Sequence, residues 1–406
     1  MSSLINQKIK DTYDGLIKTS DEQPIDGTLK NLQDGNGGVL PIQVSTGGVN
    51  FTGTVTGLPP STAGLINGSS ADTLQSAAAL TTTAAVTSGA DAIALGNGAA
   101  ADSEAVAIGK STSTTNGNGV AIGNNANGGE QAVGIGKNAN ASTKSAIAIG
   151  TDASASNLQS IAIGQVSNMT GAYGIAIGKT AVATGEQAIV IGSDTTASAN
   201  QSLAVGYSAE ATSERNVALG FDAVAGGDQA FARQNTAIGS ATIANNEQDT
   251  AVGAQATATG SRSTAIGAGA DATGSRAVVV GAESSATAFS SCVFGAFSTA
   301  TAEGATVVGG YGSSATAVDA IAVGKEADAT AIGAIAIGKL AQATVDGAVA
   351  IGSGITAATA DTVTINNLQI LDYANINYAD DAAAATGGIP LGGVYHTSGA
   401  LKIRIA

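Results

Sequence analysis

The chain has 406 residues, a formal net charge of −15 and a single cysteine. A charge this negative argues against nucleic-acid binding, which requires a basic surface, and one cysteine excludes an intrachain disulfide. Only 3% of the residues are aromatic and none is tryptophan, so few large side chains are present to fill a wide core.

The first 88 residues differ in composition from the rest of the chain. Apolar residues at positions 4, 5, 9, 13, 16 and 17 have helical spacing and predict a helix over 4–18. It is a docking helix or the start of a trimeric bundle, or else a small packing helix. Val39–Ile42 and Val49–Thr52 predict strands. We assign 1–60 to an N-terminal attachment region and the low-complexity Ser, Ala and Thr stretch 61–88 to a linker.

A short phrase then recurs nineteen times over 89–358, typically as Ala-Ile-Ala-Ile-Gly. Fourteen of the eighteen intervals between its glycines are fourteen residues long, and a fixed period of this kind decides the architecture. We predict that these glycines, which we call the repeat glycines, are structural. They include Gly96, Gly150, Gly192, Gly253, Gly281 and Gly352.

Fourteen residues suit one turn of a β-solenoid with two short strands. Large apolar residues one and three positions before the glycine, such as Ile149 and Ile147, alternate with alanines, such as Ala148 and Ala146. This period of two predicts a strand with two apolar faces. One face fills the lumen of the coil, and the other meets a further apolar surface, most simply another copy of the chain.

The repeat therefore predicts an all-β shaft of about nineteen turns over 89–358. Stacked turns are ~4.8 Å apart, which gives a rod of roughly 90 Å. So thin a coil has little core of its own, and lateral association would bury the second apolar face at ~25 cal/mol per Å². We therefore expect an obligate oligomer.

Two positions in the shaft depart from the pattern. The interval from Gly220 to Gly239 is nineteen residues long, and an insertion in a solenoid turn bulges from one face, often a binding face. Phe231 and Arg233 are candidate binding residues there, although a tolerated loop is the simpler explanation of the insertion. Cys292 lies three positions before Gly295 and is predicted to be a buried small hydrophobic residue.

Residues 359–406 form a C-terminal cap or tip. Thr362–Ile365 and Leu368–Leu371 predict strands, and Asp380–Gly388 predicts a capped helix of a single turn. A hairpin is predicted from Val394–His396 and Leu401–Ile405.

This region either covers the open edge of the solenoid or binds a receptor. In the second case Tyr395 and His396 are candidate binding residues. His396 is the only histidine of the chain, and no nucleophile–base pair can be assembled around it. We expect no enzymatic activity, no cofactor and no metal.

The phrase Ala-Ile-Ala-Ile-Gly-x-x-Ala-x-Ala at fourteen-residue spacing resembles the head repeat of trimeric autotransporter adhesins of the Yersinia adhesin type. The resemblance covers about 89–358. It implies a left-handed parallel β-roll, three copies of which wrap around one axis as a homotrimer.

The ends lead to a different expectation. The start, Leu4–Lys18, has no signal-peptide pattern, and the tail, Tyr378–Ala406, has no set of membrane-spanning strands. Both resemble ends of fibre and appendage proteins of tailed bacteriophages. The sequence therefore favours a trimeric virion fibre that docks to a phage particle protein through its N-terminal region and presents a surface for host adhesion.

The alternative is a trimeric adhesin head on a bacterial cell surface. We expect the receptor to be a glycan or a protein on a bacterial surface, and we expect no nucleic acid and no membrane insertion. A glycan-cleaving spike and an ice-binding rod are further alternatives.

Overall fold

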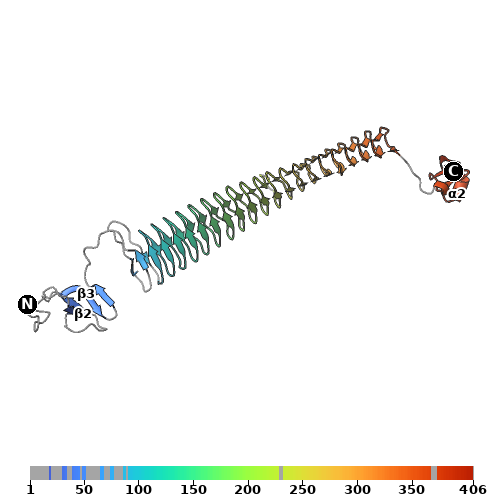
Figure 1. Cartoon of the computed structure of the whole chain (residues 1–406). Helices are drawn as coiled ribbons and strands as arrows, with labels where there is room; N and C mark the ends of the chain where they lie inside the picture. The colour runs from blue at the N-terminus through green and yellow to red at the C-terminus, as the bar shows by residue number, and fades with distance from the viewer. Residues whose placement is uncertain are drawn as a thin grey trace, which may run out of the picture.

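The computed structural model describes residues 18–19, 30–33, 39–45, 48–51, 65–67, 74–76, 86–87, 90–227, 232–366 and 373–405. Its dominant feature is a long rod of stacked turns between residues 90 and 366 (Figure 1). This confirms the all-β parallel solenoid of about nineteen turns predicted from the repeat.

Each turn contributes one strand to each of two parallel ladders. The long ladder runs from β8 (Ile93–Leu95) to β46 (Val363–Ile365), and each of its strands through β44 (Val349–Ile351) occupies the three residues before a repeat glycine. The short ladder runs from β9 (Ala100–Ala101) to β45 (Thr356–Ala357). Its strands occupy the fourth and fifth residues after each glycine, shifted by one at β39 (Ser314–Ala315), in the turn that is one residue longer.

Neighbouring turns are stacked in register, so equivalent residues form columns along the rod. Ile147, for example, pairs with Ile161, and Ala148 pairs with Ala162. The alanine face is the one that lines the lumen: Ala146 and Ala148 of the long strand, and Ala153 and Ala155 around the short strand, are fully buried. Ile147 and Ile149 point outward and are partly exposed.

The repeat glycines are required by the stacking. Gly150 has φ 138°, and a Cβ built on it would lie 2.3 Å from the carbonyl oxygen of Gly164 in the next turn. No real Cβ approaches a backbone oxygen so closely, and this φ disfavours other residues. The same close approach occurs at Gly96, Gly192, Gly253 and Gly281, whereas a Cβ on Gly352 would meet the side chain of Asn366 at 3.1 Å.

Each turn also contains two left-handed positions that the sequence did not reveal, because they are seldom glycine. They are the second residue after the repeat glycine, such as Asp152 with φ 57°, and the fifth residue before it, such as Gln159 with φ 50°. Their amides donate hydrogen bonds to the preceding turn, from Asp152 to Lys137 at 2.8 Å and from Gln159 to Lys144 at 3.1 Å. Hydrogen bonds between turns therefore hold these conformations.

Both ladders extend toward the N-terminus beyond β8 and β9. β6 (Leu74–Ser76) pairs in parallel with β8, β7 (Val86–Thr87) pairs in parallel with β9, and β5 (Leu65–Asn67) is antiparallel to β6. These strands belong to the range 61–88, which we predicted as a linker.

A four-stranded antiparallel sheet precedes the rod, in the order β1 (Lys18–Thr19), β2 (Lys30–Gln33), β3 (Val39–Ser45) and β4 (Gly48–Phe51). β3 and β4 confirm the two strands predicted there. The helix predicted over 4–18 lies outside the described residues apart from Lys18, which begins β1.

The segment after the rod contains η1 (Tyr373–Ile376), α2 (Asp381–Thr386) and a hairpin of β47 (Val394–Thr397) and β48 (Ala400–Ile403). The predicted capped helix and hairpin are confirmed: Asp380 caps α2 by accepting a hydrogen bond from the amide of Ala383 at 2.8 Å.

β46 corresponds to the strand predicted at Thr362–Ile365 and pairs with β44 as a further turn of the long ladder. Leu368–Leu371 lies outside the described residues. Within the ranges that the structure describes, no helix is long and apolar enough to cross a membrane.

Candidate functional site

The first candidate surface is the outward side of the long ladder, which we call the apolar face. It consists of the residues one and three positions before each repeat glycine. Ile191, Ile266 and Phe294 on this face are 42%, 40% and 43% exposed, in register with similar residues of the neighbouring turns. Monomeric proteins seldom expose so extended an apolar surface, which marks an interaction site.

Cys292 lies on the apolar face. We predicted it to be buried, but position three before the glycine points away from the lumen, and the thiol is only partly covered. Desolvation by the neighbouring turns raises the pKa of Cys292, so the thiol form is favoured.

The second candidate surface is one edge of the rod, where each turn bends into the long strand. We call this the polar edge and define it by the residues five and six positions before the repeat glycine in seven successive turns. The column at position five consists of Gln187, Gln201, Arg215, Gln234, Gln248, Arg262 and Arg276, and that at position six of Glu186, Asn200, Glu214, Arg233, Glu247, Ser261 and Ser275.

Side chains of the column at position five are hydrogen-bonded from turn to turn. Gln201 Nε2 donates to Gln187 Oε1 at 3.2 Å, and Arg215 Nε donates to Gln201 Oε1 at 3.1 Å. After the insertion, Gln248 Nε2 donates to Gln234 Oε1 at 3.0 Å, and Arg262 Nε donates to Gln248 Oε1 at 3.3 Å. A Gln-Gln-Arg ladder therefore flanks the insertion on both sides.

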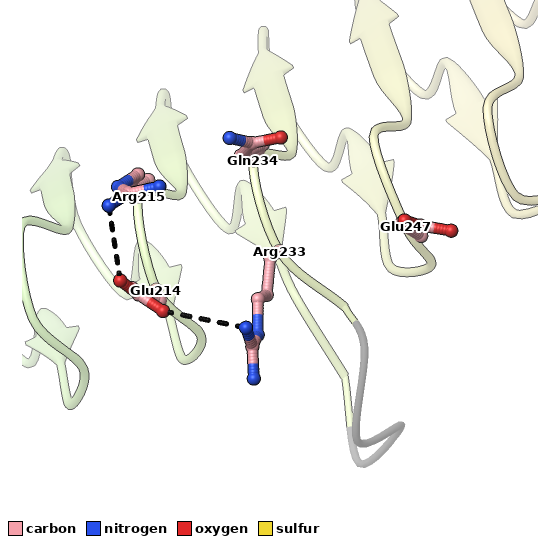
Figure 2. Close-up of a pocket in the computed structure, with 5 residues that line it drawn as sticks. All are labelled: Glu214, Arg215, Arg233, Gln234 and Glu247. Carbon is pink, nitrogen blue, oxygen red and sulfur yellow. Dashed lines mark ion pairs between the residues drawn. The ribbon is translucent and has the colours of Figure 1, made fainter.

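A pocket of about 220 Å³ lies on the polar edge where the insertion leaves the rod; it is lined by Glu214, Arg215, Arg233, Gln234 and Glu247. Figure 2 shows Glu214 between the two guanidinium groups: its carboxylate lies 3.5 Å from Arg215 Nη2 and 3.9 Å from Arg233 Nη1. These side chains are 38–58% exposed, so their ion pairs contribute little to stability. The pocket offers both donors and acceptors to a polar ligand.

A buried polar side chain closes the base of the insertion. Asn216, which lies inside the lumen, donates from Nδ2 to the carbonyl oxygens of Ala225 at 3.0 Å and Ala232 at 3.2 Å. Its Oδ1 accepts from the amide of Asn235 at 2.9 Å. One amide thus connects both ends of the inserted segment, and the rod continues in register beyond it.

The polar column continues inside the lumen through Asn235, Asp249 and Ser263, all fully buried. Asn235 Oδ1 accepts from the amide of Asp249 at 2.8 Å. The Asp249 carboxylate accepts from the amide and hydroxyl of Ser263 and from the amide of Asn246, each at 2.9 Å. Desolvation raises the pKa of Asp249, although these hydrogen bonds act in the opposite direction.

The four predicted binding residues differ in their exposure to solvent where the structure describes them. Arg233 is exposed on the polar edge, and Phe231 lies outside the described residues. Tyr395 and His396 were expected at a receptor-binding tip, but they are only 2% and 5% exposed. Tyr395 Oη donates to Asp381 Oδ1 at 2.5 Å, and this hydrogen bond raises the pKa of Tyr395 to about 12. The packing of the hairpin against α2 and η1 therefore removes both side chains from the surface.

Sequence reasoning missed the polar edge and the buried polar column. The signal for the first was the recurrence of Gln or Arg five positions before the glycine. The signal for the second was the replacement of alanine by Asn216, Asn235 and Asp249 in successive turns, at a position where alanine is usual.

Comparison with protein families matches the YadA head domain repeat to ten segments of the rod, which together cover half of the chain: 103–126, 128–153, 144–167, 170–195, 183–209, 197–223, 244–270, 258–284, 310–327 and 329–354. A search of the curated proteins found no match. The matched segments leave out 1–60 and 359–406, so the resemblance of the two ends to phage proteins gains no support. The period, the stacked repeat glycines and this match agree, and the chain belongs to the YadA head domain repeat family.

Proposed function

We propose that the chain is the head of a trimeric adhesin on a bacterial cell surface and acts by binding rather than by catalysis. The match of the head repeat along most of the rod is the observation that carries this proposal. It favours the adhesin alternative over the virion fibre that the two ends suggested, and we do not retain the fibre.

The apolar face supports the homotrimer. Its positions recur at every turn in register, so a second and a third copy placed in parallel meet equivalent positions along the whole rod. Burying partly exposed side chains such as Ile191 and Ile266 stabilises such an assembly at about 25 cal/mol per Å² of apolar surface. Lateral association thus supplies the core that a thin lumen of alanines lacks.

The polar edge supports the contact with a receptor. Arg215 and Arg233 lie beside Glu214 and Gln234 in an open, exposed pocket, which suits a ligand that both donates and accepts hydrogen bonds, such as a glycan. Side chains held in a ladder lose less freedom on binding than isolated ones, which favours affinity.

The proposal is tested by measuring the molecular mass of the assembly and by determining where the protein is found. Sedimentation of the full chain should give the mass of three copies, and peptide mass spectrometry should find the chain in washed bacterial membranes. A monomer, or detection in phage particles alone, would refute the adhesin head. Binding of the labelled full chain to a glycan array, compared with Arg233→Glu, tests the polar edge separately.

A further inference from the structure

The segment 373–405, which we call the C-terminal unit, buries very little of itself. Ala384, Tyr395 and His396 are its buried side chains among the described residues. Chains shorter than about 40 residues usually need disulfides, metals or oligomerisation to stay folded. The unit contains no cysteine, and no group of three or more metal-ligating side chains occurs in the part of the chain that the structure describes.

The hairpin of this unit has two unlike faces. Val394 pairs with Ile403, and Tyr395 pairs with Lys402. Because successive residues of a strand point to opposite faces, Tyr395, Lys402 and Arg404 share one face. This face packs on the unit itself: Tyr395 donates to Asp381 of α2, and Arg404 Nη1 donates to the carbonyl oxygen of Ile389 at 2.6 Å.

The opposite face, which we call the open face, consists of Val394, Leu401, Ile403 and Ile405. These side chains are 39%, 53%, 60% and 81% exposed, although none carries a polar group. His396 shares the face but is buried. Lys402 on the first face is exposed, and Arg404 beside it points toward the body of the unit, whereas the apolar side chains of the open face point toward solvent. Such a strand requires a partner.

We propose that the open face packs against the open faces of the other copies of this chain, so that the C-terminal units form a second assembly at the end of the rods. This inference rests on the proposed homotrimer. The open face carries no charged side chain that could select a charged partner. The apolar side chains of one copy can pack directly against those of another copy.

The short length of chain between the rod and the C-terminal unit supports other copies of this chain as the partner of the open face. Eight residue steps separate Ile365, the end of β46, from Tyr373, the start of η1, and even a fully extended chain spans at most about 29 Å over them. Rods that lie in parallel therefore hold their C-terminal units within reach of one another. A short tether of this kind gives effective concentrations in the millimolar range, which makes even a small apolar interface sufficient.

Cysteine cross-linking of the full chain tests the proposal. In a Cys292→Ser background, Ile403→Cys places a thiol on the open face, and Lys402→Cys places one on the opposite face of the same strand as a matched control. We expect mild oxidation at low protein concentration to link Ile403→Cys chains into pairs at least tenfold faster than Lys402→Cys chains. Leu401→Cys should behave as Ile403→Cys does.

Equal rates for the two faces, or no linkage of Ile403→Cys, would overturn the inference and assign the open face to a lipid surface or another protein. Sedimentation of the same proteins under reducing conditions separates the two proposals. A trimer without cross-linking refutes only the C-terminal assembly, whereas a monomer refutes the proposed adhesin head as well.

Discussion

The turns before and after the insertion share one lumen but differ on the apolar face. Three positions before the glycine, the turns up to Gly192 have Ile147, Ile161, Ile175 and Ile189, whereas the turns that follow the insertion have Thr236, Thr250 and Thr264. Two positions before it, all of these turns have alanine except the one that ends at Gly192, which has Val190. Lumen residues meet only their own chain, so their volume is fixed by the coil, while the outward column is free to follow whatever covers it.

The lumen accepts some residues larger than alanine. Val190 and Val279 are fully buried where alanine is usual, so two extra methyl groups fit. Met169 is also fully buried, and it lies beside Gly174, where a Cβ would come within 2.3 Å of Met169 Cε. The larger side chain of Met169 is thus compensated by the missing side chain of Gly174, five residues later in the chain, as close packing requires.

The largest expected effect tests what the two regions share. Gly150→Ala and Gly253→Ala should each destabilise the protein by about 3 kcal/mol or more, since each new Cβ meets a glycine oxygen at 2.3–2.4 Å and strains the backbone. Gly354→Ala is the control: its φ is 65° but no atom lies within 4 Å, so a loss of about 1 kcal/mol is expected. Chemical denaturation measures all three, and a mild effect at Gly253 alone would show that the shared rule fails after the insertion.

The repeat glycines also show how far the sequence predicts this fold. The fourteen-residue period and the alternation of apolar residues sufficed to predict the parallel solenoid and its strands, because few other folds accommodate so regular a repeat. They did not decide which apolar face is the lumen, since Ile147 and Ala148 both suit burial; the deciding feature is the width of a fourteen-residue coil, which admits alanine. Gln159 gave no hint of a left-handed backbone, because hydrogen bonds between turns, not residue type, hold it.

The candidate site was less predictable than the rod. The length of the insertion pointed to Arg233. The Gln-Gln-Arg ladder beside Arg233 was not predicted, because its residues are fourteen positions apart in the sequence and come together only when the turns stack. Tyr395 and His396 lie on opposite faces of the hairpin and are both buried, and a hairpin pattern alone does not predict that neighbouring elements cover both residues.

The second prediction tests the difference between the regions. Ile147→Asp should weaken the assembly by about 3 kcal/mol or more per chain, because the proposed trimer buries the new carboxylate without a partner. Thr250→Asp, in the same column after the insertion, should cost clearly less, because its surroundings already accommodate a hydroxyl. Ser154→Asp, on the outer side of the short ladder in the turn after Gly150, is the control and should sediment as the wild type does. Equal losses at 147 and 250 would mean that both regions are covered alike.

A smaller effect is expected from the buried carboxylate that follows the insertion. Desolvation raises the folded-state pKa of Asp249 above its ordinary value of 3.8, so the fold favours the protonated acid. The cost of the buried charge is complete above the folded-state pKa and disappears as the pH falls toward the unfolded one. Relative to Asp249→Asn, the wild type should therefore gain stability between pH 7 and about pH 4. Thermal denaturation of both proteins across this range checks the sign, and a difference independent of pH would show that Asp249 titrates normally.

The smallest effect is expected at the boundary between the two regions. Deleting residues 227–231 shortens the interval from Gly220 to Gly239 from nineteen to fourteen residues and keeps Asn216 within reach of the carbonyl oxygens of Ala225 and Ala232. Because the entropy of a loop changes slowly with its length, stability should change by less than about 1 kcal/mol. Deletion of 241–245, also five residues but inside a regular turn, should disrupt the stacking and serves as the control. If the first deletion unfolds the rod as the second does, the insertion is part of the coil; if the rod persists and only glycan binding is lost, the insertion belongs to the receptor site.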